Sequence, residues 1–438
     1  ASPLAVLIGA STTLSWSSTN ATGCSSSDGW SGAKALSGDE IISAITATTT
    51  FTLLCENSYN SASTSVTVTL TDTPLPPYAS IPAGVWYEIA NTSIATMFPT
   101  YSQTVWGTSG PGSVVNAWSG GAFDAVRNVL YVFGGGHAAY GGNEVYAFYL
   151  DEARWERMTN PSPLEPCGGA LSWNWPTVCP DYSTTTPATY YTTDGTPLSP
   201  HSYDMLEWIP SINRLFVNAT ANYPYGSNND NFAWFFDPVA KTWEQLANPP
   251  RQYTYDIWAA SAYDAVRDLV YLPKFGFITF NPATRTYSYS VPPGTSSYSY
   301  GSGDYDSTNK VLVRLRSNNA VDIYDLADLG NITKQEVAFS SISSPKPNLA
   351  LHRYGVAYHP VSDRFVLWGG DRSVWTFDYR TKTFAEYPNL TGPTPPTSTS
   401  SGVFGRWRYV PAYDVFMGFD AATNVSSSNV WLYKLPAQ

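Results

Sequence analysis

Apolar and polar residues alternate in short runs along the first part of the chain, and turn-forming residues separate the runs. The segments "STTLSWSST", "TTTFTLLCENS" and "ASTSVTVTLTD" show this alternation within residues 1–72. A period of two places successive side chains on opposite faces of a β-strand. The pattern therefore predicts a small β-sandwich over residues 1–72, followed by a proline-rich linker over residues 73–83.

Residues 84–438 carry a repeat of an aromatic residue, a turn and an apolar strand. The aromatic markers of the six copies are Phe123, Trp208, Tyr263, Tyr305, Tyr358 and Tyr409. Most copies continue through a further strand and turn into a fourth strand, as in "AWFFDPVAKTWEQL". Four strands in roughly 50 residues is typical of a propeller blade. The sequence therefore predicts an all-β fold with six blades, or seven if residues 159–200 form a blade rather than an insertion.

The two ends of this repeat region complement each other. The last copy ends at "NVWLYKLP" without a fourth strand, whereas "VWYEI", residues 85–89, has the fourth-strand pattern before the first blade. A strand from the N-terminal side would complete the last blade and leave no open edge. We therefore expect the propeller to be closed by this N-terminal strand.

Both regions resemble known families. "TLSWSSTNATGC" resembles the opening of bacterial immunoglobulin-like domains, which occur in secreted and surface proteins. Here Trp16 precedes Cys24, whereas antibody domains place their tryptophan between the two cysteines. The repeats over residues 84–435 resemble the kelch/galactose-oxidase class of β-propellers, which implies a fold and leaves the function open.

The four cysteines fall into two local pairs, Cys24 with Cys55 and Cys167 with Cys179. No C-x-x-C motif occurs, so we interpret them as two disulfides of a secreted or cell-surface protein, each contributing about 3 kcal/mol. Six N-x-S/T sequons permit glycosylation. The net charge of -11 argues against nucleic acid as a partner. No apolar run is long enough for insertion into a membrane.

Strand direction places the candidate chemistry at one end of the propeller. Strands alternate in direction, so the loop between strands two and three shares an end with the segment that leads into strand one. By contrast, His359 lies in a turn at the opposite end, where we expect it to be exposed. The residues assigned to the first end are His137, Tyr140, His201, Tyr203, Arg251, Tyr253, Tyr255, His352, Arg353, Tyr354, Asp371, Arg372 and Arg406.

One position recurs five residues before each aromatic marker. Because first strands surround the central channel, we expect this position to form a ring near the channel mouth. Aromatic rings suit the apolar faces of sugars, and arginine suits a carboxylate. Packing between sheets for stability alone is the open alternative. The six residues at this position are Trp118, Tyr203, Trp258, Tyr300, Arg353 and Phe404.

This set of residue types resembles that of the propeller-fold ulvan lyases. The resemblance implies a metal-independent elimination on uronic-acid glycans, without a cofactor. His137 and His201 would orient or deprotonate the substrate, Tyr203 would act as acid or base, and Arg353 would hold the carboxylate. The residues expected to bind the polysaccharide are Tyr140, Trp118, Trp258, Tyr300, His352, Tyr354 and Arg406.

Other functions remain open. An immunoglobulin-like module joined to a propeller is also typical of a surface adhesin, a glycan-binding protein or a subunit of an extracellular assembly. Its sheet edges could self-associate by strand addition. A copper-radical oxidase would share the fold, but it needs a cysteine cross-linked to tyrosine, and every cysteine here has an expected disulfide partner. Glycoside hydrolysis needs a carboxylate pair, for which Asp204, Asp256 and Asp371 are the few candidates.

Overall fold

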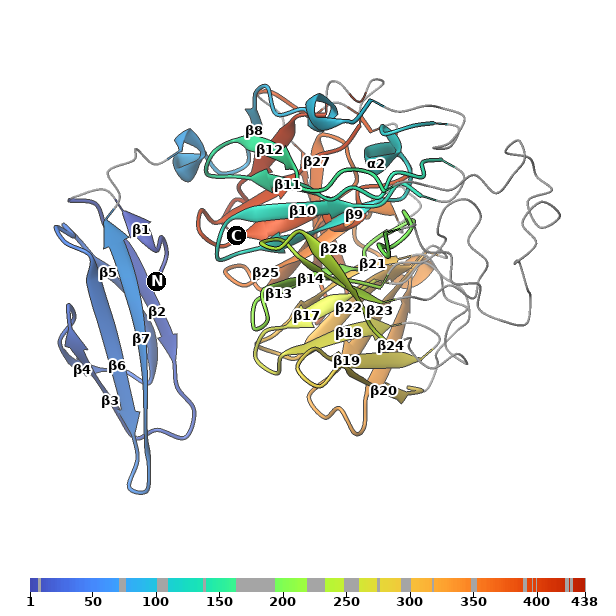
Figure 1. Cartoon of the computed structure of the whole chain (residues 1–438). Coiled ribbons are helices and arrows are strands. Elements are labelled where there is room, and N and C mark those ends of the chain that lie inside the picture. Colours follow the sequence, from blue (N-terminus) through green and yellow to red (C-terminus); the bar gives the residue numbers. More distant parts are fainter. Residues whose placement is uncertain are drawn as a thin grey trace. The chain divides into compact units, whose positions relative to one another are not determined.

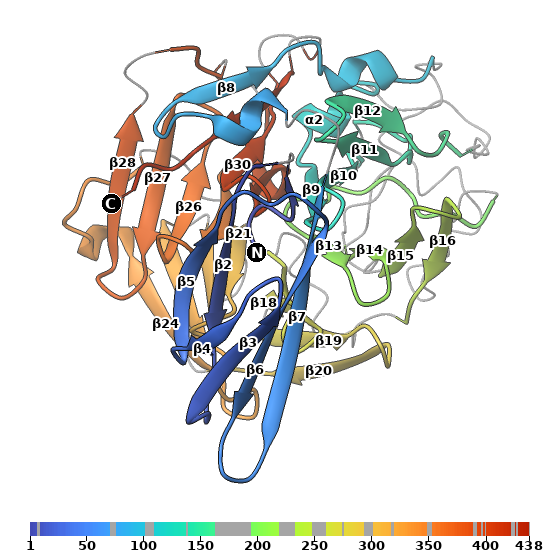
Figure 2. The same ribbon diagram turned by 90° about the vertical axis from the view of Figure 1, so that its left-hand side faces the viewer.

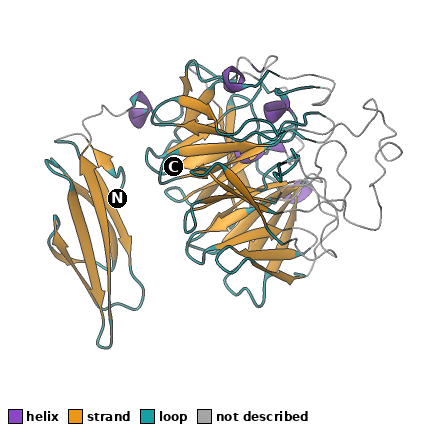
Figure 3. Ribbon diagram, viewed as in Figure 1, coloured by secondary structure: helices purple, strands orange, loops and turns teal. Residues whose placement is uncertain are grey.

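The structure is a computed structural model in which strands predominate (Figures 1 and 3). It describes residues 1–6, 9–70, 76–100, 109–136, 139–162, 194–218, 233–247, 260–273, 276–292, 301–316, 319–347, 353–388, 392–395, 397–398, 400–421, 425 and 428–437. Two compact units are present, of which residues 1–82 form most of the first, while Ala83–Tyr409 and Phe416–Gln438 form the second. No helix in these ranges has the length and hydropathy needed to cross a membrane.

The N-terminal unit is a β-sandwich of two sheets. Strands β1, β7, β6, β3 and β4 form one sheet in that order, and β2 pairs with β5 in the other. Leu14 of β2 packs against Phe51 of β6 and Val68 of β7, so the core lies between the sheets. The strands are β1 (Ala5–Val6), β2 (Thr12–Ser17), β3 (Gly23–Asp28), β4 (Gly32–Lys34), β5 (Ser37–Ile42), β6 (Thr49–Glu56) and β7 (Ser61–Leu70).

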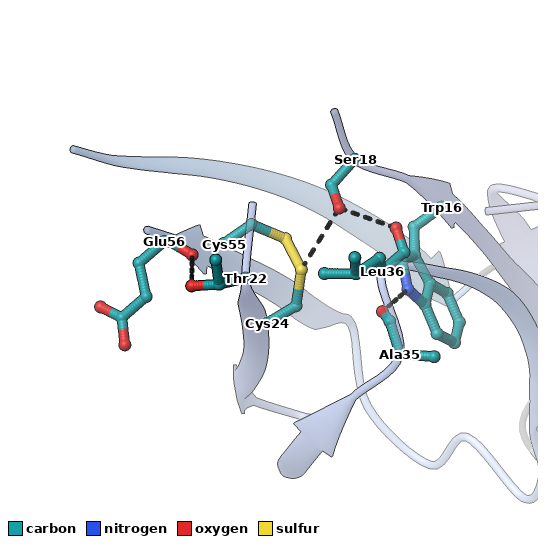
Figure 4. The surroundings of a disulfide bond; sticks show 8 residues. All are labelled: Trp16, Ser18, Thr22, Cys24, Ala35, Leu36, Cys55 and Glu56. Carbon is teal, nitrogen blue, oxygen red and sulfur yellow. Dashed lines mark hydrogen bonds between the residues drawn. A yellow bond between two sulfur atoms is a disulfide. The ribbon is translucent and has the colours of Figure 1, made fainter. Parts of the chain in front are cut away.

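The first predicted disulfide is confirmed. Cys24 of β3 and Cys55 of β6 are bonded, and they are direct partners in the antiparallel ladder. The bond therefore joins neighbouring strands of one sheet. Figure 4 shows Ser18 next to the Cys24 sulfur and the Trp16 indole donating to the carbonyl of Ala35. Cys167 and Cys179 lie outside the described residues, so their predicted bond stays a prediction.

The second unit is a propeller of six four-stranded antiparallel sheets, seen around a common centre in Figure 2. Blades 1 to 3 contain β9 (Gly120–Asp124), β10 (Val129–Phe133), β11 (Tyr146–Tyr149), β12 (Arg154–Arg157), β13 (Leu206–Ile209), β14 (Arg214–Val217), β15 (Trp234–Asp237), β16 (Thr242–Gln245), β17 (Ala262–Asp264), β18 (Leu269–Pro273), β19 (Phe277–Asn281) and β20 (Thr286–Ser290). Blades 4 to 6 contain β21 (Gly301–Asp306), β22 (Val311–Arg316), β23 (Ala320–Asp325), β24 (Thr333–Ala338), β25 (Gly355–His359), β26 (Arg364–Trp368), β27 (Ser373–Asp378), β28 (Thr383–Pro388), β29 (Trp407–Val410), β30 (Val415–Gly418), β31 (Val430–Tyr433) and β8 (Trp86–Ile89).

An aspartate shapes the first turn of several blades. In blade 1, the Asp124 carboxylate accepts hydrogen bonds from the backbone N–H groups of Val126 and Arg127, at 2.9 and 3.3 Å. Asp264 and Asp306 make the same pair of bonds in blades 3 and 4. Such bonds fold the chain back locally, as is typical of aspartate in turns. The repeated turn in the sequence is therefore specified by a local interaction.

Blade 6 contains the strand from the N-terminal side. Strand β8 pairs with β31 in antiparallel register, with Trp86 opposite Tyr433. The Trp86 side chain is 1% exposed, and its ring lies 5.2 and 5.8 Å from those of Trp368 and Trp407. This aromatic cluster ties β8 to blades 5 and 6.

The prediction of an exposed His359 is wrong. His359 is the last residue of β25, at the end opposite Tyr354, but only 4% of it is exposed. Its Nδ1 lies 2.8 Å from the Ser362 hydroxyl, and its ring packs against Tyr409 and Phe416. The residue occupies the position that aspartate fills in other blades, and the neighbouring blade covers it.

Candidate functional site

The glycine-rich loop after β10 needs its glycines because the backbone of two other segments passes close to it. Gly134 and Gly135 have φ values of 133° and 98°. A Cβ on Gly135 would lie 2.7 Å from the backbone of Ser113, in helix α2 (Ser113–Asn116), and one on Gly136 only 1.7 Å from the Ser199 carbonyl oxygen. The loop is thereby held against the segment that leads into blade 2. His137 itself lies outside the described residues.

Tyr140 is fully buried in the same loop. Its hydroxyl donates to Glu144 Oε1 at 2.7 Å, and the Tyr146 hydroxyl donates to the same oxygen at 2.6 Å. Burial raises the pKa of Glu144, although both hydroxyls oppose this effect. The carboxyl group therefore fixes the loop from within, and the structure gives Tyr140 no exposed surface.

Trp118, His201 and Tyr203 come together where blades 1 and 2 meet. The Trp118 ring is half-buried and lies 4.8 Å from the His201 ring at an angle of 39°. The Tyr203 hydroxyl lies 3.5 Å from His201 Nδ1, and the Tyr203 ring meets Phe404 edge-on at 5.3 Å. His201 and Tyr203 are 7% and 2% exposed. Trp118 is therefore the most accessible of the three side chains.

Three members of the predicted ring share an unusual backbone conformation. Trp118, Tyr203 and Phe404 have φ values of 49°, 44° and 49°. Bulky residues rarely adopt the left-handed region, which costs them about 1–2 kcal/mol each. The Tyr203 N–H donates to the Trp118 carbonyl at 2.8 Å, linking two ring positions directly. Equivalent positions in different blades are thus held in one strained geometry, of the kind that clusters at functional sites.

Arg353 and Tyr354 differ in exposure. Arg353 is exposed, and its carbonyl accepts a 2.8 Å bond from the Val403 N–H, which places it beside Phe404. Tyr354 is 1% exposed and belongs to the core between blades 4 and 5. Burial raises the pKa of Tyr354. Of these two residues, Arg353 is the one with an accessible side chain.

Arg406 is fully buried rather than open to a ligand. Its guanidinium donates to Ser119, to the Gly402 carbonyl and to Asp420, with Nη2 2.8 Å from Asp420 Oδ1. The burial lowers the pKa of Arg406, and the Asp420 charge opposes this. The predicted contact with substrate does not fit this geometry, because the arginine joins the segments before β9 and β29.

The centre of the propeller holds charged residues that the sequence analysis did not bring together. Asp204, Glu207 and Arg408, which are 1%, 7% and 8% exposed, lie there with the partly buried Asp304, and we call these four residues the central ion cluster. Arg408 Nη2 lies 3.2 Å from Asp204 Oδ1 and 2.7 Å from the Gly121 carbonyl oxygen of β9. The cluster therefore connects blades 1, 2 and 6.

The other blades reach the same cluster. The Gly303 N–H of β21 donates to Asp204 Oδ2 at 2.9 Å, and the Tyr358 N–H of β25 donates to Asp304 Oδ2 at 2.7 Å. The Ser261 hydroxyl, which precedes β17, donates to Glu207 at 2.8 Å. All six blades thus contribute at least one group to the central ion cluster or to its bonds.

The cluster has three carboxyl groups and one guanidinium. Burial raises the pKa of Asp204 to about 6 and that of Glu207 to about 8, although Arg408 opposes both shifts. Burial also raises the pKa of Asp304. Because the acidic pair Asp204 and Glu207 is almost inaccessible to solvent, it does not offer the open carboxylate pair that hydrolysis needs.

Several predicted site residues lie outside the described residues: His137, Trp258, Tyr300, His352, Arg251, Tyr253, Tyr255 and Asp256. Within the described ranges, no group of three or more His, Cys, Asp or Glu side chains is placed to hold a metal ion. The residues missed by the sequence analysis are Glu207, Asp304 and Arg408. Their signal was the presence of charged residues inside first strands that are otherwise apolar or glycine-rich.

The sequence matches no protein-family model and no curated protein. Among solved structures, a fungal alcohol oxidase of the AA5 family in complex with copper shares 11% identity, with a TM-score of 0.44 over 98% of this chain and 74% of that one. Auxiliary nutrient-binding proteins from Bacteroides thetaiotaomicron and Bacteroides ovatus each share 8% identity over 98% of this chain and 95% of theirs, with TM-scores of 0.42 and 0.41. The fold assignment here rests on the strand pairings.

Proposed function

We propose that this chain is an extracellular carbohydrate-binding protein that binds glycans at the mouth of the propeller. The observation that carries the proposal is the half-buried Trp118 ring next to His201 and Tyr203. An indole face gives a sugar ring an apolar surface, and the buried His201 ring packs against this indole. The Cys24–Cys55 disulfide supports an oxidising, extracellular location.

Arg353 points to acidic glycans as the preferred class. Arg353 is the exposed cation among the residues that lie five positions before an aromatic marker. The hydrogen bond from the Val403 N–H to its carbonyl keeps its backbone beside Phe404. A guanidinium binds a carboxylate with two parallel hydrogen bonds, which a neutral sugar cannot reproduce. A uronic-acid glycan would therefore bind more tightly than its neutral counterpart.

Titration calorimetry with polyuronate oligosaccharides and neutral oligosaccharides of equal length tests the proposal. Trp118→Ala should weaken the binding of acidic and neutral oligosaccharides by about tenfold or more. A tenfold loss corresponds to about 1.4 kcal/mol of binding free energy. Arg353→Gln should remove only the preference for the acidic glycan. Tyr59→Ala, which removes an aromatic side chain 89% exposed in the N-terminal unit, is the matched control and should change nothing. Unchanged binding in Trp118→Ala would refute the site.

Elimination on a uronic-acid glycan is the second candidate, and the contact between Tyr203 and His201 favours it. One of the two residues would remove the proton at C5. The electron pair of the broken C5–H bond would then form the C4–C5 double bond as the C4–O bond breaks. The other would protonate the leaving oxygen, while Arg353 neutralises the carboxylate. The low exposure of both side chains makes binding the stronger proposal.

Ultraviolet absorbance of the unsaturated product distinguishes the two functions. If the protein is a lyase, absorbance should rise during incubation with a polyuronate. Tyr203→Phe should abolish that rise and preserve binding, because the ring remains and only the hydroxyl is lost. Binding by the wild-type protein without any unsaturated product would exclude elimination and leave the carbohydrate-binding function.

A further inference from the structure

Strand β7 of the N-terminal unit has a long edge without a neighbouring strand. On one side it pairs with β6 over eight residue pairs, from Ser61 to Val68. On the other side it pairs with β1 at only two residues, Thr69 and Leu70. Within the described part of this unit, no strand pairs with the outer side of Ser61–Val68, which we call the β7 edge.

The direction of the backbone groups along this edge follows from two hydrogen bonds. The Thr69 N–H donates to the Leu4 carbonyl of the β1 side at 2.9 Å, whereas the Leu70 N–H donates to Thr48 Oγ1 at 3.0 Å. Because these groups alternate along a strand, every second residue directs its N–H and C=O away from β6. The residues that do so on the β7 edge are Ser61, Ser63, Ser65 and Thr67.

Strands β4 and β5, which lie at two other edges of this unit, carry charges that discourage pairing. Strand β4 is three residues long and ends on Lys34, which is paired with Glu40 at 2.6 Å. Strand β5 contains Asp39 and Glu40. Short strands and charged side chains are the usual protection of a sheet edge against another chain. Strand β7 has neither protection, since its sequence "SASTSVTVTL" is ten residues long and has no charge and no proline.

We propose that the β7 edge pairs antiparallel with the β7 edge of a second copy of this chain, forming a symmetric dimer with one continuous sheet. An edge without charges is self-complementary, because no like charges face each other across the two-fold axis. Full overlap places Ser61 opposite Thr67 of the second copy, and Thr64 opposite its own equivalent. This proposal is independent of the proposed glycan site.

The side chains suit this pairing. On the outer face, Thr67 already bonds with Thr50 at 2.8 Å, and Ser65 bonds with Thr52 at 2.7 Å. A second β7 would extend this row of hydroxyl pairs by placing Ser63 opposite Ser65. Cross-strand hydroxyl pairs add modestly to the stability of a sheet. Since a single strand-to-strand contact is small, we expect a dimer that depends on protein concentration.

Sedimentation velocity of the full chain over a concentration series tests the proposal. The mean mass should rise from one chain toward two with increasing concentration. Ser63→Lys/Ser65→Lys should abolish this rise, because four lysines would meet at the two-fold axis. Ala33→Lys/Ala35→Lys adds the same charge at exposed positions on and next to β4 and should leave dimerisation unchanged. A chain that stays monomeric, or equal loss in both variants, overturns the proposal.

A cysteine placed on the two-fold axis tests the register. Thr64 and its equivalent would form a pair without direct hydrogen bonds, whose Cα atoms lie about 4.5 Å apart, within reach of a disulfide. Thr64→Cys should therefore give a covalent dimer on mild oxidation, and peptide mapping should show Cys24–Cys55 intact. Thr67→Cys, which is also at an exposed position but far from its own equivalent, should not. Equal cross-linking in the two variants, or none in Thr64→Cys, contradicts the proposed pairing.

Discussion

Arg408 Nη2 lies 3.2 Å from Asp204 Oδ1 at the centre of the propeller, although the two residues are 204 positions apart in the sequence. Arg408 follows the start of the last blade and Asp204 precedes the second, so their contact spans the point where the ring closes. The same guanidinium also binds the Gly121 carbonyl of blade 1. The contact therefore joins three blades that meet only when the propeller is complete.

The first prediction is that Arg408→Met destabilises the propeller by about 3–5 kcal/mol, because it removes the cation of the central ion cluster and leaves its buried carboxylates. Chemical denaturation followed by tryptophan fluorescence measures the loss. Asp204→Asn/Arg408→Met should be less destabilising than the sum of the single variants, since the two residues interact directly. Additive losses would show that the pair does not couple.

The second prediction concerns pH. The pKa of Glu207 rises from its ordinary 4.5 to about 8 on folding, with Asp204, Asp304 and Arg408 as its charged neighbours. The folded protein therefore holds a proton that the unfolded chain releases between these two values. The free energy of unfolding should fall as pH rises through this window, with a slope of up to about 1.4 kcal/mol per pH unit for one proton. Asp204, with its pKa raised to about 6, adds to the fall at the lower end.

Denaturation midpoints between about pH 5 and pH 8 measure this slope. Glu207→Gln keeps the shape and removes the titrating proton, so it should flatten the profile. Glu244→Gln is the matched control, because Glu244 is exposed on β16 and should leave the slope unchanged. A wild-type protein that gains stability across this range would contradict the prediction.

The architecture could be predicted because each blade carries its own local signals. The aromatic markers, the turn aspartates and the alternation of apolar residues act within a few residues of each other, so one sequence reveals them. The closing strand β8 could also be predicted from a local pattern. The segment "VWYEI" has the pattern of a fourth strand, but no first three strands of a blade precede it.

The site was harder to predict because burial depends on neighbouring blades. Arg406 and Arg408 are both buried, and their ion-pair partners Asp420 and Asp204 lie elsewhere in the sequence. His359 was expected to be exposed because its own turn is polar, yet Tyr409 and Phe416 of the next blade cover it. Strand direction places His201 and Tyr203 at one end, and the position five residues before each aromatic marker places Trp118 there. Neither argument needs knowledge of side-chain packing, and the three side chains do lie together.

The third prediction is that Cys167 and Cys179 form a disulfide bond. The two cysteines are twelve residues apart, and the Cys24–Cys55 bond indicates an oxidising compartment. Peptide mapping without reduction should recover both pairs. Free thiols at Cys167 and Cys179 alongside an intact Cys24–Cys55 bond would disprove the second pair only.

The fourth prediction concerns the extent of the propeller. Removal of residues 1–72 should leave a domain that unfolds cooperatively, because β8 remains to complete blade 6. Removal of residues 1–92 deletes β8 and exposes the edge of β31, so the remaining chain should unfold at a lower temperature and aggregate. Calorimetry of the two truncated chains measures the difference. Equally cooperative melting of both would show that β8 does not close the ring.

The last prediction isolates the side chain that holds the closing strand. Trp86 is 1% exposed, packs against Trp368 and Trp407, and donates its indole N–H to the Arg372 carbonyl at 2.9 Å. Trp86→Ala should therefore cost about 3–5 kcal/mol. The backbone amides of β31 should exchange their hydrogens faster in this variant, because the partner strand β8 detaches first. Trp234→Ala in blade 2 also removes a buried indole, but it should leave exchange in β31 slow. Slow exchange in β31 of Trp86→Ala would mean that the main-chain ladder alone keeps β8 in place.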